Sequence, residues 1–139
     1  MREKRRVKVG VISNTSWYLY NFRMPLMQAL RGAGYDVVAM APADPYSNRI
    51  VESGVRHRNI HLRGASINPF SEVRGVLDIF RVLREERVDF LLSYTPKCNI
   101  YSGIVCAIIG VVAVPNVSGL GRVFIKKSFL TVIVKFYVS

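Results

Sequence analysis

Short apolar runs alternate with longer segments of helical periodicity along most of this 139-residue chain. The runs that favour strands cover residues 7–12, 36–42, 55–62, 90–93 and 111–117. Between them, apolar residues recur at spacings of three and four, as they do in amphipathic helices. This βαβαβ order with short connections predicts an α/β fold, a Rossmann-like parallel sheet with helices on both faces.

Proline and glycine mark the ends of the predicted helices. After the first strand, Pro25 falls in the first turn of a helix and Gly34 lies just beyond its end. A short helix is predicted over 45–53, and a very apolar one over 99–109 is stopped by Gly110. In the first helix, the residues expected to face the core are Phe22, Leu26, Ala29, Leu30 and Ala33.

A longer helix is predicted to begin at the pair Asn68–Pro69, as N-cap and first helical residue, and to end near Arg87. Most of its charged residues are expected on the face turned to solvent. Its predicted core face consists of Val73, Val76, Leu77, Phe80 and Leu83.

Polar loops follow three of the predicted strands. They are SNTSWYLYNFR after Ile12, SYTPKCN after Leu92 and NVSGLGR after Pro115. Because ligands of open α/β sheets bind at the carboxyl ends of the strands, the three loops are predicted to form one site.

The side chains of these loops suit an anionic ligand that carries hydroxyl groups. Arg23, Lys97 and Arg122 are each expected near a helix N-terminus, where an anion would offset the unfavourable interaction of the cation with the helix dipole. Loop amides and hydroxyls could bind sugar hydroxyls or simply cap helices, and loop glycines could allow close backbone approach or serve an ordinary turn. These residues are Asn14, Thr15, Ser16, Asn21, Asn116, Ser118, Gly119 and Gly121.

Four aromatic residues crowd the first loop: Trp17, Tyr18, Tyr20 and Phe22. Such a cluster could stack on a sugar, enter a membrane interface or pack against a neighbouring segment. The residues alone leave these alternatives open.

The formal charge of +11 implies attraction to nucleic acid, an acidic membrane face or phosphorylated small molecules. Nucleic acid is disfavoured, because no recognisable nucleic-acid-binding motif accompanies the basic residues. The G-x-G-x-x-G, G-x-x-x-x-G-K-[ST] and G-x-S-x-G patterns are also missing from the sequence. His57 and His61 lie among arginines, so no metal site is predicted.

Cys98 and Cys106 are too far apart on one predicted helix for a disulfide, which suits a reducing cytoplasm. The longest apolar stretch, 103–115, is shorter than the roughly 20 residues that span a bilayer.

Residues 1–123 are expected to form one domain, and residues 124–139 are expected to be the start of a helix that is cut short. The apolar stripe of that last segment is Phe129, Val132, Ile133, Phe136 and Tyr137.

With these motifs in place, the chain resembles the N-terminal domain of the family 4 glycosyltransferases. The stretches that carry the resemblance are SNTSWYLYNFRMPLMQALRGAGYDVVAMAP, SYTPKCNIYSGIVCAIIG and VPNVSGLGRVF, in that order, within 7 to about 136. The most similar members are bacterial enzymes that add sugars to undecaprenyl-diphosphate-linked glycans for capsule, O-antigen or exopolysaccharide.

The resemblance implies one half of a GT-B architecture, in which two Rossmann-like domains face a cleft. This chain would hold the acceptor, a lipid-linked glycan, and a C-terminal domain would bind the nucleotide-sugar donor. Transfer would retain anomeric configuration and need neither metal nor cofactor. The implied acceptor or phosphate-binding residues are Asn14, Thr15, Ser16, Tyr18, Asn21, Arg23, Thr95, Lys97 and Asn99, and those facing the donor diphosphate are Asn116, Ser118, Gly119, Gly121 and Arg122. Catalytic residues are left unassigned.

Two hypotheses follow. The chain is an acceptor-binding fragment of a glycosyltransferase, inactive without a C-terminal domain in cis or in trans. Alternatively, it is a non-catalytic binding module, or a split subunit that pairs with a separate donor-domain chain. In either case a cytoplasmic location is expected, with peripheral attachment to the inner face of the cytoplasmic membrane through the basic N-terminus and the loop aromatics.

Overall fold

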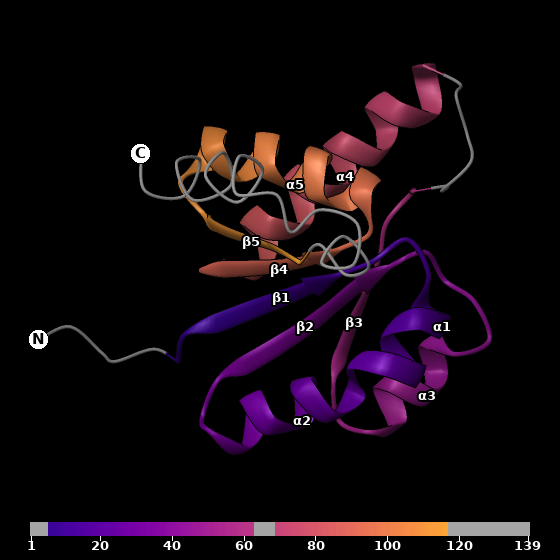
Figure 1. Ribbon diagram of the computed structural model, residues 1–139, viewed down its shortest axis with the longest axis vertical. Coiled ribbons are helices and arrows are strands. Elements are labelled where there is room, and N and C mark those ends of the chain that lie inside the picture. The colour runs from indigo at the N-terminus through magenta and orange to yellow at the C-terminus, as the bar shows by residue number, and fades with distance from the viewer. Residues whose placement is uncertain (1–5, 63–68, 117–139) are drawn as a thin grey trace, which may run out of the picture.

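A computed structural model describes residues 6–62 and 69–116. Asn68, Ser118, Gly119, Gly121, Arg122 and the segment 124–139, all named above, lie outside these ranges. The described strands are all parallel and lie in the order β3-β2-β1-β4-β5, which confirms the predicted α/β sheet (Figure 1). They are β1 (Lys8–Ile12), β2 (Asp36–Ala41), β3 (Arg56–Asn59), β4 (Phe90–Tyr94) and β5 (Val112–Asn116).

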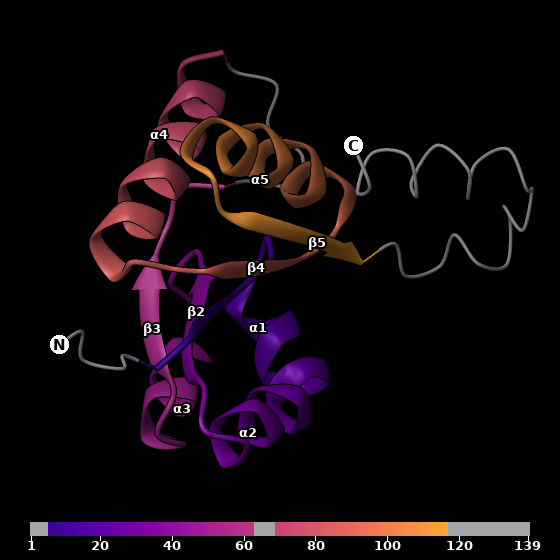
Figure 2. The same cartoon turned by 90° about the vertical axis from the view of Figure 1, so that its left-hand side faces the viewer.

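The helices cover both faces of the sheet. α1 (Ser16–Tyr18), the π-helix η1 (Leu19–Arg23), α2 (Met24–Gly32) and α3 (Ser47–Glu52) lie on one face. α4 (Pro69–Glu86) and α5 (Pro96–Ile109) lie on the other, as Figure 2 also shows. The connections that leave β1 and β4, two neighbouring strands, therefore run over opposite faces. The carboxyl ends of β1 and β4 thus form the topological switch point, where open α/β sheets bind ligands.

Alternation along the central strands builds a core on each face. In β2, Val38 and Met40 pack under α4 and α5, whereas Val37 and Ala39 pack against the α1–α3 side. Strands buried on both faces have near-continuous apolar sequences, which is why their positions could be predicted from the sequence. Gly34 and Gly110 end their helices with φ of +98° and +80°, also as predicted.

The predicted core face of the first helix is wrong in part. Phe22 is 53% exposed, and Ala29 and Ala33 are also exposed, while Leu19 and Met27 are the buried residues of the run. A π-helical turn is wider than an α-helical one, so η1 shifts the register of the residues after Leu19. Only Leu26 and Leu30 of the predicted stripe remain half-buried.

The predicted core face of α4 also needs correction. Val73 and Leu77 are 58% and 60% exposed, whereas Asp78 and Glu86 are buried. These carboxylates are buried because basic groups pair with them, and hydrophobic periodicity does not detect such positions. Leu83 is buried as predicted, and Val76 and Phe80 are half-buried.

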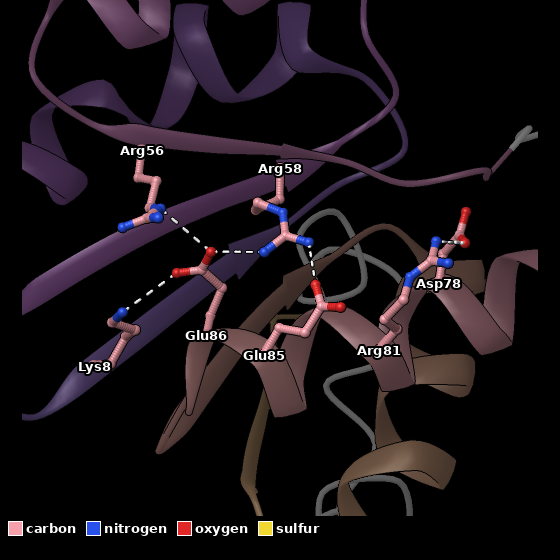
Figure 3. Close-up of polar contacts among 7 residues, drawn as sticks. All are labelled: Lys8, Arg56, Arg58, Asp78, Arg81, Glu85 and Glu86. Carbon is pink, nitrogen blue, oxygen red and sulfur yellow. Dashed lines mark hydrogen bonds and ion pairs between the residues drawn. The ribbon is translucent and has the colours of Figure 1, made fainter.

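Glu86 joins α4 to two strands that are not neighbours (Figure 3). One carboxylate oxygen accepts from Lys8 Nζ of β1 at 3.3 Å. The other accepts from Arg58 of β3 at 2.7 Å and lies 3.2 Å from Arg56 Nε. Burial raises the pKa of Glu86, but the hydrogen bonds from Arg58 and Lys8 and the charge of Arg56 outweigh it and hold the pKa below its ordinary value.

Within the described part of the chain, no helix has both the length and the apolar character needed to cross a bilayer. Cys98 and Cys106 are free thiols on the buried face of α5, and burial raises the pKa of each to about 11. Both are therefore protonated and serve as small apolar core residues.

Candidate functional site

The loops that follow β1 and β4 meet at the switch point. Ile12 and Ser93 are paired in register, so the chains that leave the two strands start side by side. Tyr18, from the first loop, packs its ring 6.0 Å from the ring of Tyr94, the last residue of β4. The loops after β1 and β4, two of the three predicted to form one site, are therefore in direct contact.

Arg23 is the cation of this site. Its guanidinium carbon lies 4.3 Å from the ring centroid of Tyr94 and 5.4 Å from that of Tyr18, and its Nη2 donates to the Tyr18 hydroxyl at 2.8 Å. Among residues 6–62 and 69–116, no carboxylate forms an ion pair with it, and its buried Nε lacks a hydrogen-bond partner. Stacking on two rings fixes the cation, and no counter-ion for its charge is found among the described residues.

Arg23 is the N-cap of α2, as expected for a cation near a helix N-terminus, but this terminus continues from another helical segment. The helical run begins at Ser16, and η1 passes directly into α2 at Arg23. The cation is positioned by the two tyrosine rings and not by a helix dipole. Burial raises the pKa of Tyr94, an effect that Arg23 only partly offsets, so the phenol beneath the cation stays neutral.

Thr95 follows Tyr94 with a strained backbone. Its φ of +82° and ψ of +143° lie where side-chain-bearing residues are rarely found, at a typical cost of about 1–3 kcal/mol. Its Oγ1 is buried and has no hydrogen-bond partner in the described structure. The Thr95 hydroxyl is nevertheless near the Cys98 thiol and partly offsets the rise that burial causes in the pKa of Cys98. Backbone strain of this kind is common at ligand-binding sites, and the role of Thr95 in acceptor binding stays a prediction.

Ser16 belongs to a different, buried cluster. Its hydroxyl is fully buried, donates to the Pro42 carbonyl at 2.7 Å and lies 3.1 Å from Ser47 Oγ and 2.9 Å from His57 Nε2. Because the Ser16 proton goes to a carbonyl, His57 must donate through Nε2 and does not act as a base toward the serine. Ser16 thus ties α1 to β2 and β3 and is not open to a ligand.

His57 is a second kind of residue whose contacts the sequence pattern did not indicate. Burial lowers its pKa, and Asp44 only partly opposes that shift, so the imidazole is neutral near pH 7. The position of His57 among arginines suggested a solvated or partly packed side chain, and in the structure it is half-buried. Its contact with Ser16 joins residues far apart in the sequence, and no local signal marks such a pair.

Lys97 and Asn99 are turned to partners within the fold. Lys97 Nζ donates to Glu72 Oε1 of α4 at 2.7 Å, which neutralises the charge expected to meet an anion. Asn99 accepts from Ser93 Oγ at 2.6 Å and donates to the Asn116 carbonyl at 3.2 Å. The two asparagines thus link the loop after β4 to the end of β5.

The remaining polar residues of the first loop also have internal partners. Thr15 Oγ1 accepts from the Tyr18 backbone N–H at 3.0 Å, and Asn21 Nδ2 donates to the Trp17 carbonyl at 2.9 Å. Asn14 is half-buried beside Ser13, 3.4 Å from its hydroxyl. The site that remains for a ligand is therefore the Arg23 cation with its tyrosines and the exposed rings beside it.

Within the described residues, no group of His, Cys, Asp and Glu could hold a metal ion.

The fold is that of a Rossmann-like α/β domain, the type of domain from which GT-B glycosyltransferases are built. The chain is 28% identical over 137 residues to N,N'-diacetylbacillosaminyl-diphospho-undecaprenol alpha-1,3-N-acetylgalactosaminyltransferase of Campylobacter jejuni, covering 96% of this chain and 36% of that protein. The chain thus spans about a third of the length of this curated relative. No protein-family model matches it.

Solved structures agree on the fold. A glycosyltransferase from Rickettsia africae superposes with a TM-score of 0.65 at 11% identity, over 81% of this chain and 30% of that one. The C-terminal domain of the PF1911 hydrogenase from Pyrococcus furiosus gives 0.61 at 15% identity, over 84% of this chain and 96% of that one. Structural likeness therefore defines the fold alone. The chain is thus similar in sequence to part of the Campylobacter transferase and similar in fold to one domain of a GT-B glycosyltransferase.

Proposed function

We propose that this chain is the acceptor-binding half of a family 4, retaining glycosyltransferase that extends a lipid-linked glycan in cell-surface polysaccharide synthesis. A second, C-terminal domain in cis or in trans would bind the nucleotide-sugar. The proposal needs no metal or other cofactor, because protein cations can stabilise a diphosphate without one.

The observation that carries the proposal is the state of Arg23. A guanidinium stacked on Tyr18 and Tyr94, without a carboxylate partner in the described residues, is prepared for an external anion. It lies at the switch point, where a nucleotide or lipid diphosphate would enter an α/β sheet. The relative from Campylobacter is named for an acceptor that contains such a diphosphate.

In this mechanism, the residues of this chain bind and orient. Arg23 would hold a phosphate of the acceptor or of the donor, and its pre-organised position would lower the cost of bringing the two substrates together. Tyr18 fixes the guanidinium through its hydroxyl, and Tyr94 supports it from below. The donor-binding groups of the second domain would complete the site.

A chimera tests the proposal. The 137 aligned residues of the Campylobacter relative are replaced by those of this chain, and transfer of N-acetylgalactosamine is measured with diphospho-undecaprenol-linked monosaccharides. We expect transfer by the chimera, with retention of anomeric configuration and no loss with a metal chelator, and none by residues 1–139 alone. Transfer by the isolated chain would contradict the acceptor-half role, and a folded chimera inactive on every lipid-linked acceptor would contradict the glycosyltransferase.

Arginine variants sharpen this test. Arg23→Ala in the chimera is expected to lower kcat/KM by about 10- to 100-fold, because a charge-assisted contact to phosphate is lost. Arg49→Ala is the matched control, since Arg49 also stacks on two tyrosines, Tyr20 and Tyr46, at α3. Its kcat/KM should stay within about twofold of the parent chimera.

A further inference from the structure

Four aromatic rings form a continuous row that ends at the Arg23 cation. The centroid distances are 5.5 Å from Trp17 to Phe22, 5.3 Å from Phe22 to Tyr18 and 6.0 Å from Tyr18 to Tyr94. Exposure changes along the row, since Trp17 and Phe22 are 45% and 53% exposed and Tyr94 is 3% exposed. The row therefore has an open apolar end and a buried cationic end.

Polar groups at the open end are already used by the fold. The Asn21 amide donates to the Trp17 carbonyl, and the Thr15 hydroxyl caps Tyr18. The Asp44 carboxylate accepts from the Trp17 backbone N–H at 3.0 Å. A sugar subsite needs polar groups that point at the ligand as well as a ring to stack on. An apolar chain needs only the exposed ring surfaces, so it suits this end better.

The other end suits a phosphate. The Arg23 guanidinium lies over Tyr18 and Tyr94, and its Nε is buried without a partner among the described residues. Charge complementarity thus favours an anion directly beside the apolar pair. A ligand that joins a diphosphate to a hydrocarbon chain would satisfy both ends at once.

We infer that the row formed by Trp17, Phe22, Tyr18 and Tyr94, with Arg23, binds the polyisoprenyl-diphosphate portion of a lipid-linked substrate. Arg23 takes the diphosphate, and the Trp17–Phe22 pair takes the first isoprene units. The inference rests on the proposed function and specifies which part of the acceptor this chain holds. It does not assign the groups that bind the sugar of the acceptor.

Trp17 is the only tryptophan of the chain, so its fluorescence reports on this site directly. Residues 1–139 are titrated with farnesyl diphosphate, inorganic pyrophosphate, farnesol and the methyl glycoside of N-acetylglucosamine. Farnesyl diphosphate is expected to change the Trp17 emission and to bind at least about tenfold more tightly than pyrophosphate or farnesol, because it contacts both ends of the row. The methyl glycoside is expected to leave the emission unchanged.

Matched variants separate the site from general effects. Phe22→Ala and Arg23→Gln are each expected to raise the Kd for farnesyl diphosphate by about tenfold. Phe70→Ala, at an exposed phenylalanine of α4, and Arg49→Gln should leave the Kd within about twofold. Circular dichroism checks that each variant is folded.

Three results would overturn the inference. Equal affinity for pyrophosphate and farnesyl diphosphate would show an anion site without an isoprenyl contact. A response to the methyl glycoside that Phe22→Ala removes would make the exposed pair a sugar subsite. A Trp17 emission that does not respond to any of the four probes would contradict binding at this site. Transfer by the chimera would still test the proposed function independently.

Discussion

At the scale of single residues, Gly75 of α4 lies close against the backbone of another segment. A Cβ atom at this position would lie 2.4 Å from the carbonyl oxygen of His61, in the chain that leaves β3. Glycine therefore lets the helix pass directly over that segment. Gly103 of α5 offers a contrast, because a Cβ there would meet no atom within 4 Å among those described.

Gly75→Ala is expected to lower the free energy of unfolding by about 1–3 kcal/mol, because the helix must move away from a backbone atom. Gly103→Ala, also within a helix, should raise it by about 0.5–1 kcal/mol, since alanine restricts the unfolded chain. Urea unfolding followed by circular dichroism measures both. A Gly75→Ala variant as stable as the parent would mean that α4 can shift without cost.

The residue types at the strand ends predicted a site, and Tyr18 and Arg23 of the first loop do contact Tyr94 at the end of β4. The sequence does not reveal which polar groups the fold uses internally. Ser16 and Lys97 have the right type and position, but their partners, His57 and Glu72, come from distant segments. Those pairings depend on tertiary contacts that no local pattern encodes.

At the scale of elements, the strands were predictable and the orientation of the helices was less so. Strands such as β2 are buried on both faces and are recognised as apolar runs. The faces of the helices were misjudged where a π-turn changes the register, in η1, and where paired acids enter the core, in α4. Hydrophobic periodicity assumes a regular helix and a core without charges, and neither condition holds here.

Glu86→Gln is expected to lower the free energy of unfolding by about 2–4 kcal/mol, because it leaves Lys8, Arg56 and Arg58 without their shared buried partner. Glu85→Gln is the matched control. Glu85 is half exposed and, among the described residues, pairs with Arg58 alone, so a loss of at most about 1 kcal/mol is expected. Similar losses for the two variants would contradict the role of Glu86.

The Glu86 contribution should also depend on pH. Its pKa in the folded protein is below the unfolded value of roughly 4.3, so its stabilisation is full above that pH and is lost as the pH falls through the folded pKa. The unfolding curve of Glu86→Gln should therefore change less than that of the parent between about pH 5 and pH 3.

At the scale of the whole molecule, the formal charge of +11 is the dominant property. A lipid-linked acceptor would present its diphosphate at a membrane surface, and anionic lipids attract each nearby Lys or Arg by about 1 kcal/mol. The exposed rings of Trp17 and Phe22 could add an apolar contact at such an interface. Peripheral attachment thus agrees with the proposed function.

Vesicle flotation tests this attachment. Residues 1–139 are expected to float with vesicles that contain phosphatidylglycerol and to remain below with vesicles of phosphatidylcholine alone. Raising the salt to about 0.5 M should release the protein, because screening shortens the range of the attraction. Equal flotation with both kinds of vesicle would mean that charge does not direct binding.

The bridge made by Glu86 has a mechanical consequence for the sheet. Lys8 and Arg56 begin β1 and β3, so one carboxylate fastens these two strands across β2 at the amino edge. Sliding of the strands past one another is resisted there. The Glu86 bridge does not restrain the opposite edge of the sheet, where the loops after β1 and β4 carry the proposed ligand-binding groups. Any movement of this domain on binding a substrate would then have its pivot at the amino edge of the sheet.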